Sequence, residues 1–213
     1  MPNCQIEYKQ QVLTASWCEK HKHQCEGLGF LIASANDEYR EQRESRSGQS
    51  YSTAGNRLKA KGVKSGVPDL QLPIPCFIDG QLYTGLYIEM KKVEFPYSDK
   101  TSKPLKPQFT KPSEGQIAWL YNLQQFGHFT TVCYTADSIN ISHGEFKVNQ
   151  RGAIDVICDY LGIDRVAIEH GKLYSNWFAD YQATLYEHPM FNRLTNTLHT
   201  LQSADPFKDE IHF

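Results

Sequence analysis

The sequence of 213 residues contains no apolar run long enough to span a membrane, so no transmembrane helix is expected. Its N-terminus, MPNCQIEYKQ, lacks the basic start and following apolar stretch of a secretory signal peptide. Its six cysteines are scattered and form no compact disulfide framework. Together, the missing export signal and the scattered cysteines predict reduced thiols and an intracellular, cytoplasmic protein.

Net charge is also small, at −2, but it is unevenly distributed. Residues 57–112 hold ten Lys or Arg against five acids, whereas residues 153–213 hold four against nine. A basic middle segment is what a polyanion such as nucleic acid requires, and a solvated surface is the alternative. The hydrophobic fraction of 40% suits one medium-sized domain with a buried core.

The first part of the chain predicts a helix, a short apolar segment and a polar loop. Residues 5–17 have helical spacing. Their apolar stripe consists of Ile6, Leu13 and Trp17. Residues 28–34 form a short apolar run that predicts a strand or buried connector. Residues 41–56 are polar and rich in Gly and Ser, which is typical of a loop.

The middle of the chain predicts extended structure. Residues 66–73 indicate a turn and a short strand that ends at Pro73. Asp79-Gly80 is a hairpin signal between two extended pieces, so we expect an antiparallel β-meander. Residues 93–112 contain four prolines and four lysines, which predict a long basic loop without a helix or central strand.

Helical and strand patterns then alternate. Ser113 and Gln116 have the spacing of a capping box at the start of a helix that ends near Phe126. Residues 129–134 predict a strand, and residues 153–163 predict a helix. Four apolar residues in the tail also fit one helical face: Phe191, Leu194, Leu198 and Leu201.

Three polar residues on adjacent predicted strands form the candidate site. Glu89 and Lys91 lie two positions apart in an extended segment, so their side chains share a face. Asp69 begins the neighbouring strand and converges on Glu89 if the register allows. Two carboxylates at that separation suit Mg²⁺ or Mn²⁺. A lysine beside such an ion can stabilise charge on a phosphate. The alternative is that Glu89 and Lys91 form an ordinary solvated ion pair on the strand.

The same residues carry a family resemblance. Pro68-Asp69 followed by Glu89-Met90-Lys91 resembles the PD-(D/E)xK nuclease signature. The surrounding blocks NRLKAKGVKSGVPDLQLP, GLYIEMKK, SEGQIAWLYNLQQFGHFTTVCY and AIDVICDYL resemble, in this order, the VRR-NUC subfamily. The resemblance covers roughly residues 5–163.

The resemblance implies an α/β fold with a restriction-endonuclease-like core. Its mixed, mostly antiparallel sheet would be flanked by helices. It also implies metal-dependent hydrolysis of DNA phosphodiesters, often at branched or flap structures. The implied metal ligands are Glu7, Asp69, Glu89 and the carbonyl of Met90. Lys91 would be catalytic, and Gln116 would face the site, although capping is an equally good role for Gln116.

Candidate DNA contacts lie mostly before the site. The stretch SANDEYR, with Asn36 and Arg40, resembles a family segment. Four basic residues with no acids among them approach the candidate site: Arg57, Lys59, Lys61 and Lys64. We expect these residues to contact phosphates, and the loop of residues 93–112 is a further candidate.

We expect two parts, a nuclease-like domain at residues 1–163 and a helical extension at residues 164–213. The resemblance also implies that a homodimer is plausible, since stand-alone family members, many of them from phages, can act as dimers on DNA junctions. For a phage-encoded protein the compartment would be the host cytoplasm. The long loop 93–112 and the segment 135–152 depart from the family pattern.

Alternatives remain at this stage. The fold could serve as a DNA-binding module with weak catalysis, or as a sequence-specific restriction-type nuclease. Cys18, His21, His23 and Cys25 supply zinc-binding atoms, but four ligands within eight residues are cramped for a tetrahedral site. A polar, partly exposed helix end is the simpler expectation there.

Overall fold

A computed structural model describes residues 4–34, 43–44, 50–51, 60, 62, 64–174 and 177–181. The chain divides into two compact units, Met1–Leu173 and Tyr174–Phe213. The first unit includes the short helix α5 (Arg165–Glu169), which begins after the expected end of the nuclease-like domain. Of the second unit the structure describes only a few residues, and the tail stripe from Phe191 to Leu201 lies outside them.

The centre of the first unit is a four-stranded mixed sheet. Its order is β1 (Ile32–Ala33), β4 (Leu70–Leu72), β7 (Leu86–Met90) and β10 (Phe129–Cys133). The first two pairings are antiparallel, and β10 runs parallel to β7. The expected α/β class with a mixed, mostly antiparallel sheet is therefore confirmed.

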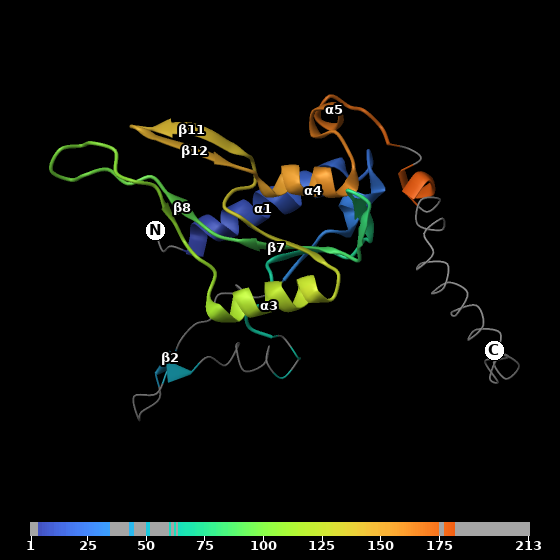
Figure 1. Ribbon diagram of the computed structural model, residues 1–213, viewed down its shortest axis with the longest axis horizontal. Coiled ribbons are helices and arrows are strands. Elements are labelled where there is room, and N and C mark those ends of the chain that lie inside the picture. The colour runs from blue at the N-terminus through green and yellow to red at the C-terminus, as the bar shows by residue number, and fades with distance from the viewer. Residues whose placement is uncertain are drawn as a thin grey trace, which may run out of the picture. The chain divides into compact units, whose positions relative to one another are not determined.

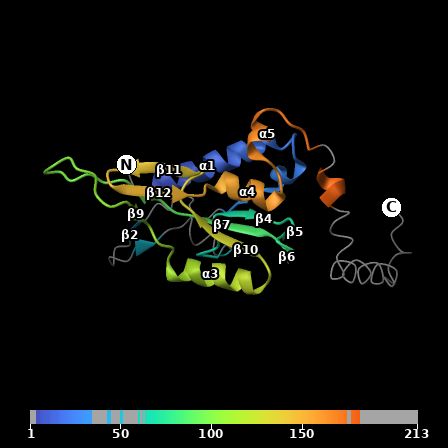
Figure 2. The same cartoon turned by 45° about the horizontal axis from the view of Figure 1, so that its top comes forward.

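Helices cover both faces of this sheet (Figure 2). Helices α1 (Cys4–His21) and α4 (Ala153–Leu161) lie on one side and α3 (Glu114–Gln125) on the other. The core lies under α1 and α4 because alternate residues of β4 and β7 point there. Its largest buried side chains include Leu70, Leu72, Leu86, Ile88, Met90 and Ile157.

Helix α1 buries a different stripe from the expected one. Ile6 and Leu13 are 40% and 52% exposed, so the apolar stripe faces mainly solvent. The buried residues of this helix are instead Gln11, Thr14, Cys18 and His21. Polar side chains are tolerated in such positions when they have hydrogen-bond partners. The Thr14 hydroxyl, for example, donates to the Gln10 carbonyl at 2.9 Å.

The end of this helix is polar and partly exposed, as predicted: Lys20, Lys22 and His23 are exposed, whereas His21 and Gln24 are buried. The His21 Nδ1 and Gln24 Oε1 atoms share a hydrogen bond of 2.5 Å. The Gln24 amide donates to the Ile168 carbonyl of α5 at 2.7 Å. These contacts hold the turn after α1 against α5.

The hairpin predicted at Asp79-Gly80 is present. Both residues have positive φ angles of 50° and 79°, as a two-residue hairpin turn requires, and they join β5 (Cys76–Ile78) to β6 (Gln81–Tyr83). The expected continuous meander is wrong, however. The hairpin forms its own two-stranded sheet, while β4 pairs directly with β7.

Residues 93–112 contain no helix and no strand of the central sheet, as expected, but the long loop is folded into a hairpin (Figure 1). Strands β8 (Val93–Glu94) and β9 (Gln108–Phe109) pair at its base, and a bridge joins Tyr97 to Pro104. We call residues 93–109 the hairpin arm. A second hairpin, β11 (Ile139–His143) with β12 (Phe146–Gln150), occupies the segment before α4 and lies beside the arm.

Short elements complete the described chain. The turn after α1 contains a 3₁₀ helix, η1 (Glu26–Phe30). Within the expected loop 41–56 the structure describes one antiparallel pair, β2 (Arg43–Glu44) with β3 (Ser50–Tyr51). Among the described residues, no helix combines the length and apolar character needed to cross a membrane.

Candidate active site

The sheet register brings the two acids of the candidate site together. Leu70 pairs with Ile88 across the antiparallel strands β4 and β7. One step outward along both strands, Asp69 therefore faces Glu89 on the same side of the sheet. Because Leu86, Ile88 and Met90 point into the core, Glu89 and Lys91 project from the opposite face of β7, where α3 packs.

Asp69 is held by the backbone of β7. Its Oδ2 accepts a hydrogen bond of 2.7 Å from the Met90 amide, and the residue is 5% exposed. Its own carbonyl accepts from the Ser34 amide at 2.7 Å. The carboxylate therefore bridges β4 to the end of β7 and has a fixed orientation.

Glu89 is fully buried and lies at the centre of the cluster. Its Oε1 accepts from the Lys91 ammonium at 2.7 Å and from the side-chain amide of Gln116. Its Oε2 is buried and has no hydrogen-bond partner in the part of the chain that the structure describes. Burial, and after it the charge of Asp69, raises the pKa of Glu89 to about 7 despite the neighbouring ammonium of Lys91.

Lys91 lies among the three acidic side chains and contacts two of them. Besides Glu89, its Nζ lies 3.9 Å from the Glu7 Oε2 and donates to the Met90 carbonyl at 3.1 Å. Burial alone would lower the pKa of Lys91. The hydrogen bond and charge of Glu89, with the charges of Glu7 and Asp69, outweigh burial and raise that pKa above its ordinary value. Lys91 is therefore an ammonium at neutral pH.

Glu7 reaches this cluster from the first turn of α1. Its Oε1 accepts from the Lys92 backbone amide at 3.1 Å, which ties the helix to the residue that follows Lys91. The N-terminal end of α1 thus meets the end of β7, although the two elements are far apart in the sequence.

Gln116 has two contacts at once. Its side-chain carbonyl accepts from the Ser113 amide at 2.8 Å, which completes a capping box at the start of α3. Its amide nitrogen donates to Glu89. Capping and contact with the site, which the sequence presents as competing roles, coexist in the structure.

The oxygen atoms of this cluster fit a divalent cation that prefers oxygen ligands. Asp69 and Glu89 supply two adjacent carboxylates, and among the described residues none donates a hydrogen bond to the buried Oε2 of Glu89. The Met90 carbonyl, which accepts from the Lys91 ammonium at 3.1 Å, is a third oxygen at the end of β7. Within the described residues no three Asp, Glu, His or Cys side chains gather as a metal site, so a ligand role for Glu7 stays a prediction.

The approach to Asp69 contains a residue whose role the sequence analysis missed. Gly66 has a φ of +81°, and a Cβ there would lie 3.1 Å from the Gly115 backbone of α3. The Trp119 indole donates to the Ser65 carbonyl at 3.1 Å. The sequence feature that could have indicated this role is the glycine shortly before the Pro-Asp pair, because a glycine in a turn permits close approach of two backbones.

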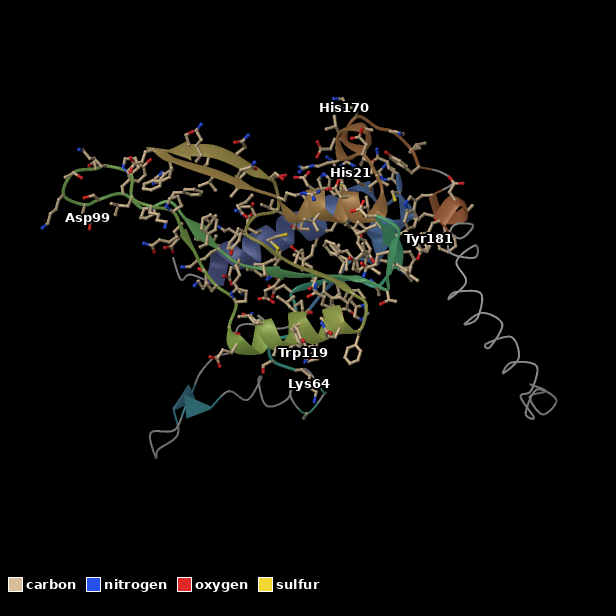
Figure 3. The ribbon with its side chains drawn as sticks, viewed as in Figure 1. His21, Lys64, Asp99, Trp119, His170 and Tyr181 are labelled. Atoms are coloured by element: carbon tan, nitrogen blue, oxygen red, sulfur yellow. The ribbon has the colours of Figure 1, made fainter. Side chains whose placement is uncertain are left out.

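Most of the predicted DNA contacts fall outside the described residues: Asn36, Arg40, Arg57, Lys59 and Lys61. Lys64 is exposed and lies near Trp119 on the α3 side of the sheet (Figure 3). The structure thus places one of the predicted basic residues on the side of the sheet that carries Glu89.

The zinc hypothesis gains no support from the structure. Cys18, His21 and Cys25 are buried, whereas His23 is exposed. Burial raises the pKa of the Cys18 thiol to about 12, which keeps it protonated and a poor metal ligand. No cluster of metal-binding side chains forms there among the described residues.

No protein-family model matches the chain, and neither does any curated protein. A solved structure described as a "VRR_NUC domain protein" is similar over 74% of this chain and 89% of that chain. The sequence identity is 19% and the TM-score is 0.44.

Proposed function

We propose that the protein is a Mg²⁺- or Mn²⁺-dependent DNA endonuclease that hydrolyses phosphodiester bonds. The observation that carries the proposal is the buried Glu89. It lies opposite Asp69, pairs with Lys91 at 2.7 Å and keeps one oxygen to which no residue in the described ranges donates. A protein that only binds DNA has no use for two carboxylates at the position of a phosphate, because they repel it.

The electrostatics of the cluster suit metal-assisted hydrolysis. Burial, and after it repulsion from the adjacent carboxylate of Asp69, raises the pKa of Glu89 above its usual range. A divalent cation held by Asp69, Glu89 and the Met90 carbonyl would polarise a phosphate oxygen and lower the pKa of a water molecule. Both carboxylates would then be ionised, as ligands must be.

Lys91 supplies a fixed positive charge. Because its pKa is raised, it cannot serve as a general base at neutral pH, and it can donate hydrogen bonds to an attacking water or a non-bridging phosphate oxygen. In the reaction a water oxygen bonds to phosphorus, the bond to one ester oxygen breaks, and that oxygen leaves as an alcohol. No covalent enzyme intermediate forms.

Glu7 and Gln116 position these groups. Gln116 fixes the Oε1 of Glu89 from α3, and Glu7 fixes the backbone after Lys91 from α1. Helices on both faces of the sheet thereby hold the end of β7, so the acids and the ammonium keep one geometry. A preference for branched or flap DNA is part of the proposal, and it rests on the resemblance of the sequence to the VRR-NUC subfamily.

Cleavage of labelled DNA with a metal titration tests the proposal. The substrates are a flap, a fork, a four-way junction, a linear duplex and a single strand, each incubated with Mg²⁺, Mn²⁺ or EDTA. The variants are Asp69→Asn, Glu89→Gln and Lys91→Ala. Lys147→Ala, at an exposed position on β12, is the matched control.

We expect cleavage by the wild type and Lys147→Ala with either metal, and loss of cleavage in EDTA and in the three site variants. Undiminished cleavage by Asp69→Asn and Lys91→Ala would remove the assignment. Tight binding without cleavage under any divalent ion would indicate a binding module instead. Discrete plasmid fragments would indicate a sequence-specific enzyme.

A further inference from the structure

The hairpin arm starts at the candidate active site itself. Its first strand, β8, follows Lys91 and Lys92 directly, and the Thr110 amide donates to the Lys92 carbonyl at 3.1 Å to close its base. After the arm the chain enters α3, where Gln116 contacts Glu89. The arm therefore begins and ends beside the buried acids.

Backbone hydrogen bonds give the arm a defined shape out to its tip. The Leu105 amide donates to the Pro96 carbonyl at 2.9 Å, and the Ser98 amide donates to the Lys103 carbonyl at 2.8 Å. Figure 3 shows Asp99 at the end farthest from the sheet. At about eight residues per side, the arm spans at most ~26 Å.

The β11–β12 hairpin braces the arm from one side. His143 is 5% exposed, its ring lies against the rings of Phe95 and Tyr97, and its Nε2 lies 2.9 Å from the Pro96 carbonyl. At the turn, a Cβ on Gly144 would lie only 3.0 Å from the Pro104 side chain. Packing of this kind keeps an extended hairpin in place without a core of its own.

The outer part of the arm is basic. Lys100, Lys103 and Lys106 are exposed and form no ion pair within the described part of the chain. One acid, Asp99, lies among them. Glu94, at the base of the arm, forms an ion pair with Lys92 at 2.6 Å. Three exposed lysines on a braced arm form a positively charged surface, and phosphates are a partner that such charges fit.

We infer that the hairpin arm is a DNA-contacting element that holds the duplex beside the cleaved bond, with Lys100, Lys103 and Lys106 on its phosphates. The inference rests on the proposed function, because it is the position of the cleaved phosphate at Lys91 that directs the duplex along the arm. At about 3.4 Å per base pair, the arm covers about seven base pairs of flanking duplex.

Binding to DNA in EDTA, where no cleavage occurs, tests the arm apart from catalysis. The probes are fluorescent forked duplexes with a flank of about four or about fifteen base pairs, titrated at several salt concentrations. The test variant is Lys100→Ala/Lys103→Ala/Lys106→Ala. The control variant, Lys20→Ala/Lys22→Ala/Lys172→Ala, loses the same charge at exposed positions away from the arm.

On the long flank, the arm variant should bind at least about tenfold more weakly, and the slope of log K against log salt should shrink by about 2 to 3. On the short flank, the arm variant and the wild type should bind alike. The control should match the wild type on both, and each variant should keep the wild-type circular dichroism spectrum.

Equal affinity and salt slope for the arm variant and the wild type on the long flank would overturn the inference. If the wild type still cleaves DNA with Mg²⁺ in that case, the proposed function stands and only the role of the arm is lost. Failure of the wild type to bind any of the probes in EDTA would also overturn the inference, and absence of cleavage with Mg²⁺ and Mn²⁺ as well would overturn the proposed function.

Discussion

The side-chain amide of Gln116 donates to the buried carboxylate of Glu89 while its carbonyl oxygen accepts from the Ser113 amide at 2.8 Å. One residue thereby joins the start of α3 to the centre of the candidate site. A change at this position alters both the stability of the helix and the geometry of the acid.

These two roles of Gln116 can be separated with Ser113. Ser113→Ala removes the hydroxyl that accepts from the Gln116 backbone amide, so it should cost about 1 kcal/mol of stability and leave cleavage nearly unchanged. Gln116→Ala should cost a similar amount and also lower kcat about tenfold, because Glu89 loses a donor. Urea unfolding and cleavage kinetics measure the two effects. Equal kcat for both variants would assign Gln116 to capping alone.

Lys91 should matter for the chemical step and little for the binding of DNA. Lys91→Ala should lower kcat by a factor of about 100 to 1000, since it removes a fixed charge beside the reacting phosphate. Affinity for DNA in EDTA should change less than about threefold, because Lys91 is only 6% exposed. Single-turnover cleavage and fluorescence anisotropy provide the two readouts, with Lys147→Ala as the control. A loss confined to affinity would contradict a catalytic role.

The metal-free protein should lose stability as the pH rises through neutrality. Burial and the charge of Asp69 raise the pKa of Glu89 from 4.5 to about 7. An acid with a raised pKa in the folded state stabilises the fold fully below its unfolded pKa, and that contribution is lost as the pH rises through the folded pKa. The whole shift corresponds to at most about 3 kcal/mol.

Thermal unfolding in EDTA between about pH 5 and pH 8 measures this dependence. The wild type should show a falling Tm, and Glu89→Gln, which cannot ionise there, should show a flatter profile. Added Mg²⁺ should raise the Tm of the wild type more at the upper end, where the carboxylates are free of protons. Parallel profiles for the two proteins would mean that Glu89 ionises normally.

Substitution of Gly66 should destabilise the protein more than substitution of Gly62, although both glycines have positive φ angles, +81° and +87°. Gly62→Ala meets no atom within 4 Å, so it should cost only the backbone strain of about 1 kcal/mol. Gly66→Ala adds a contact of 3.1 Å with the Gly115 backbone, and should cost about 2 to 3 kcal/mol in urea unfolding. Cleavage should also fall, because this turn leads to Asp69. Equal losses of stability for the two variants would show that α3 can shift to make room for the added Cβ.

Much of the fold was predictable because its causes are local. The apolar spacing of residues 153–163 predicts α4, the Asp79-Gly80 pair predicts the β5–β6 turn, and Ser113 with Gln116 predicts the start of α3. The continuous β-meander was wrong, since local signals mark where strands begin and end but not which strands pair. The hairpin arm was missed for a related reason, because its shape depends on contacts with His143 and Gly144.

By itself, the sequence determined that Glu89 and Lys91 share one face of an extended segment, because side chains alternate along any strand. The tertiary structure decided that Asp69 faces Glu89, through the pairing of Leu70 with Ile88, and that Glu7 reaches the Lys92 amide. It also decided that α1 buries Thr14 and Cys18 and leaves Leu13 half exposed. Register and burial depend on which surfaces meet in the folded chain, and no pattern within one segment contains that information.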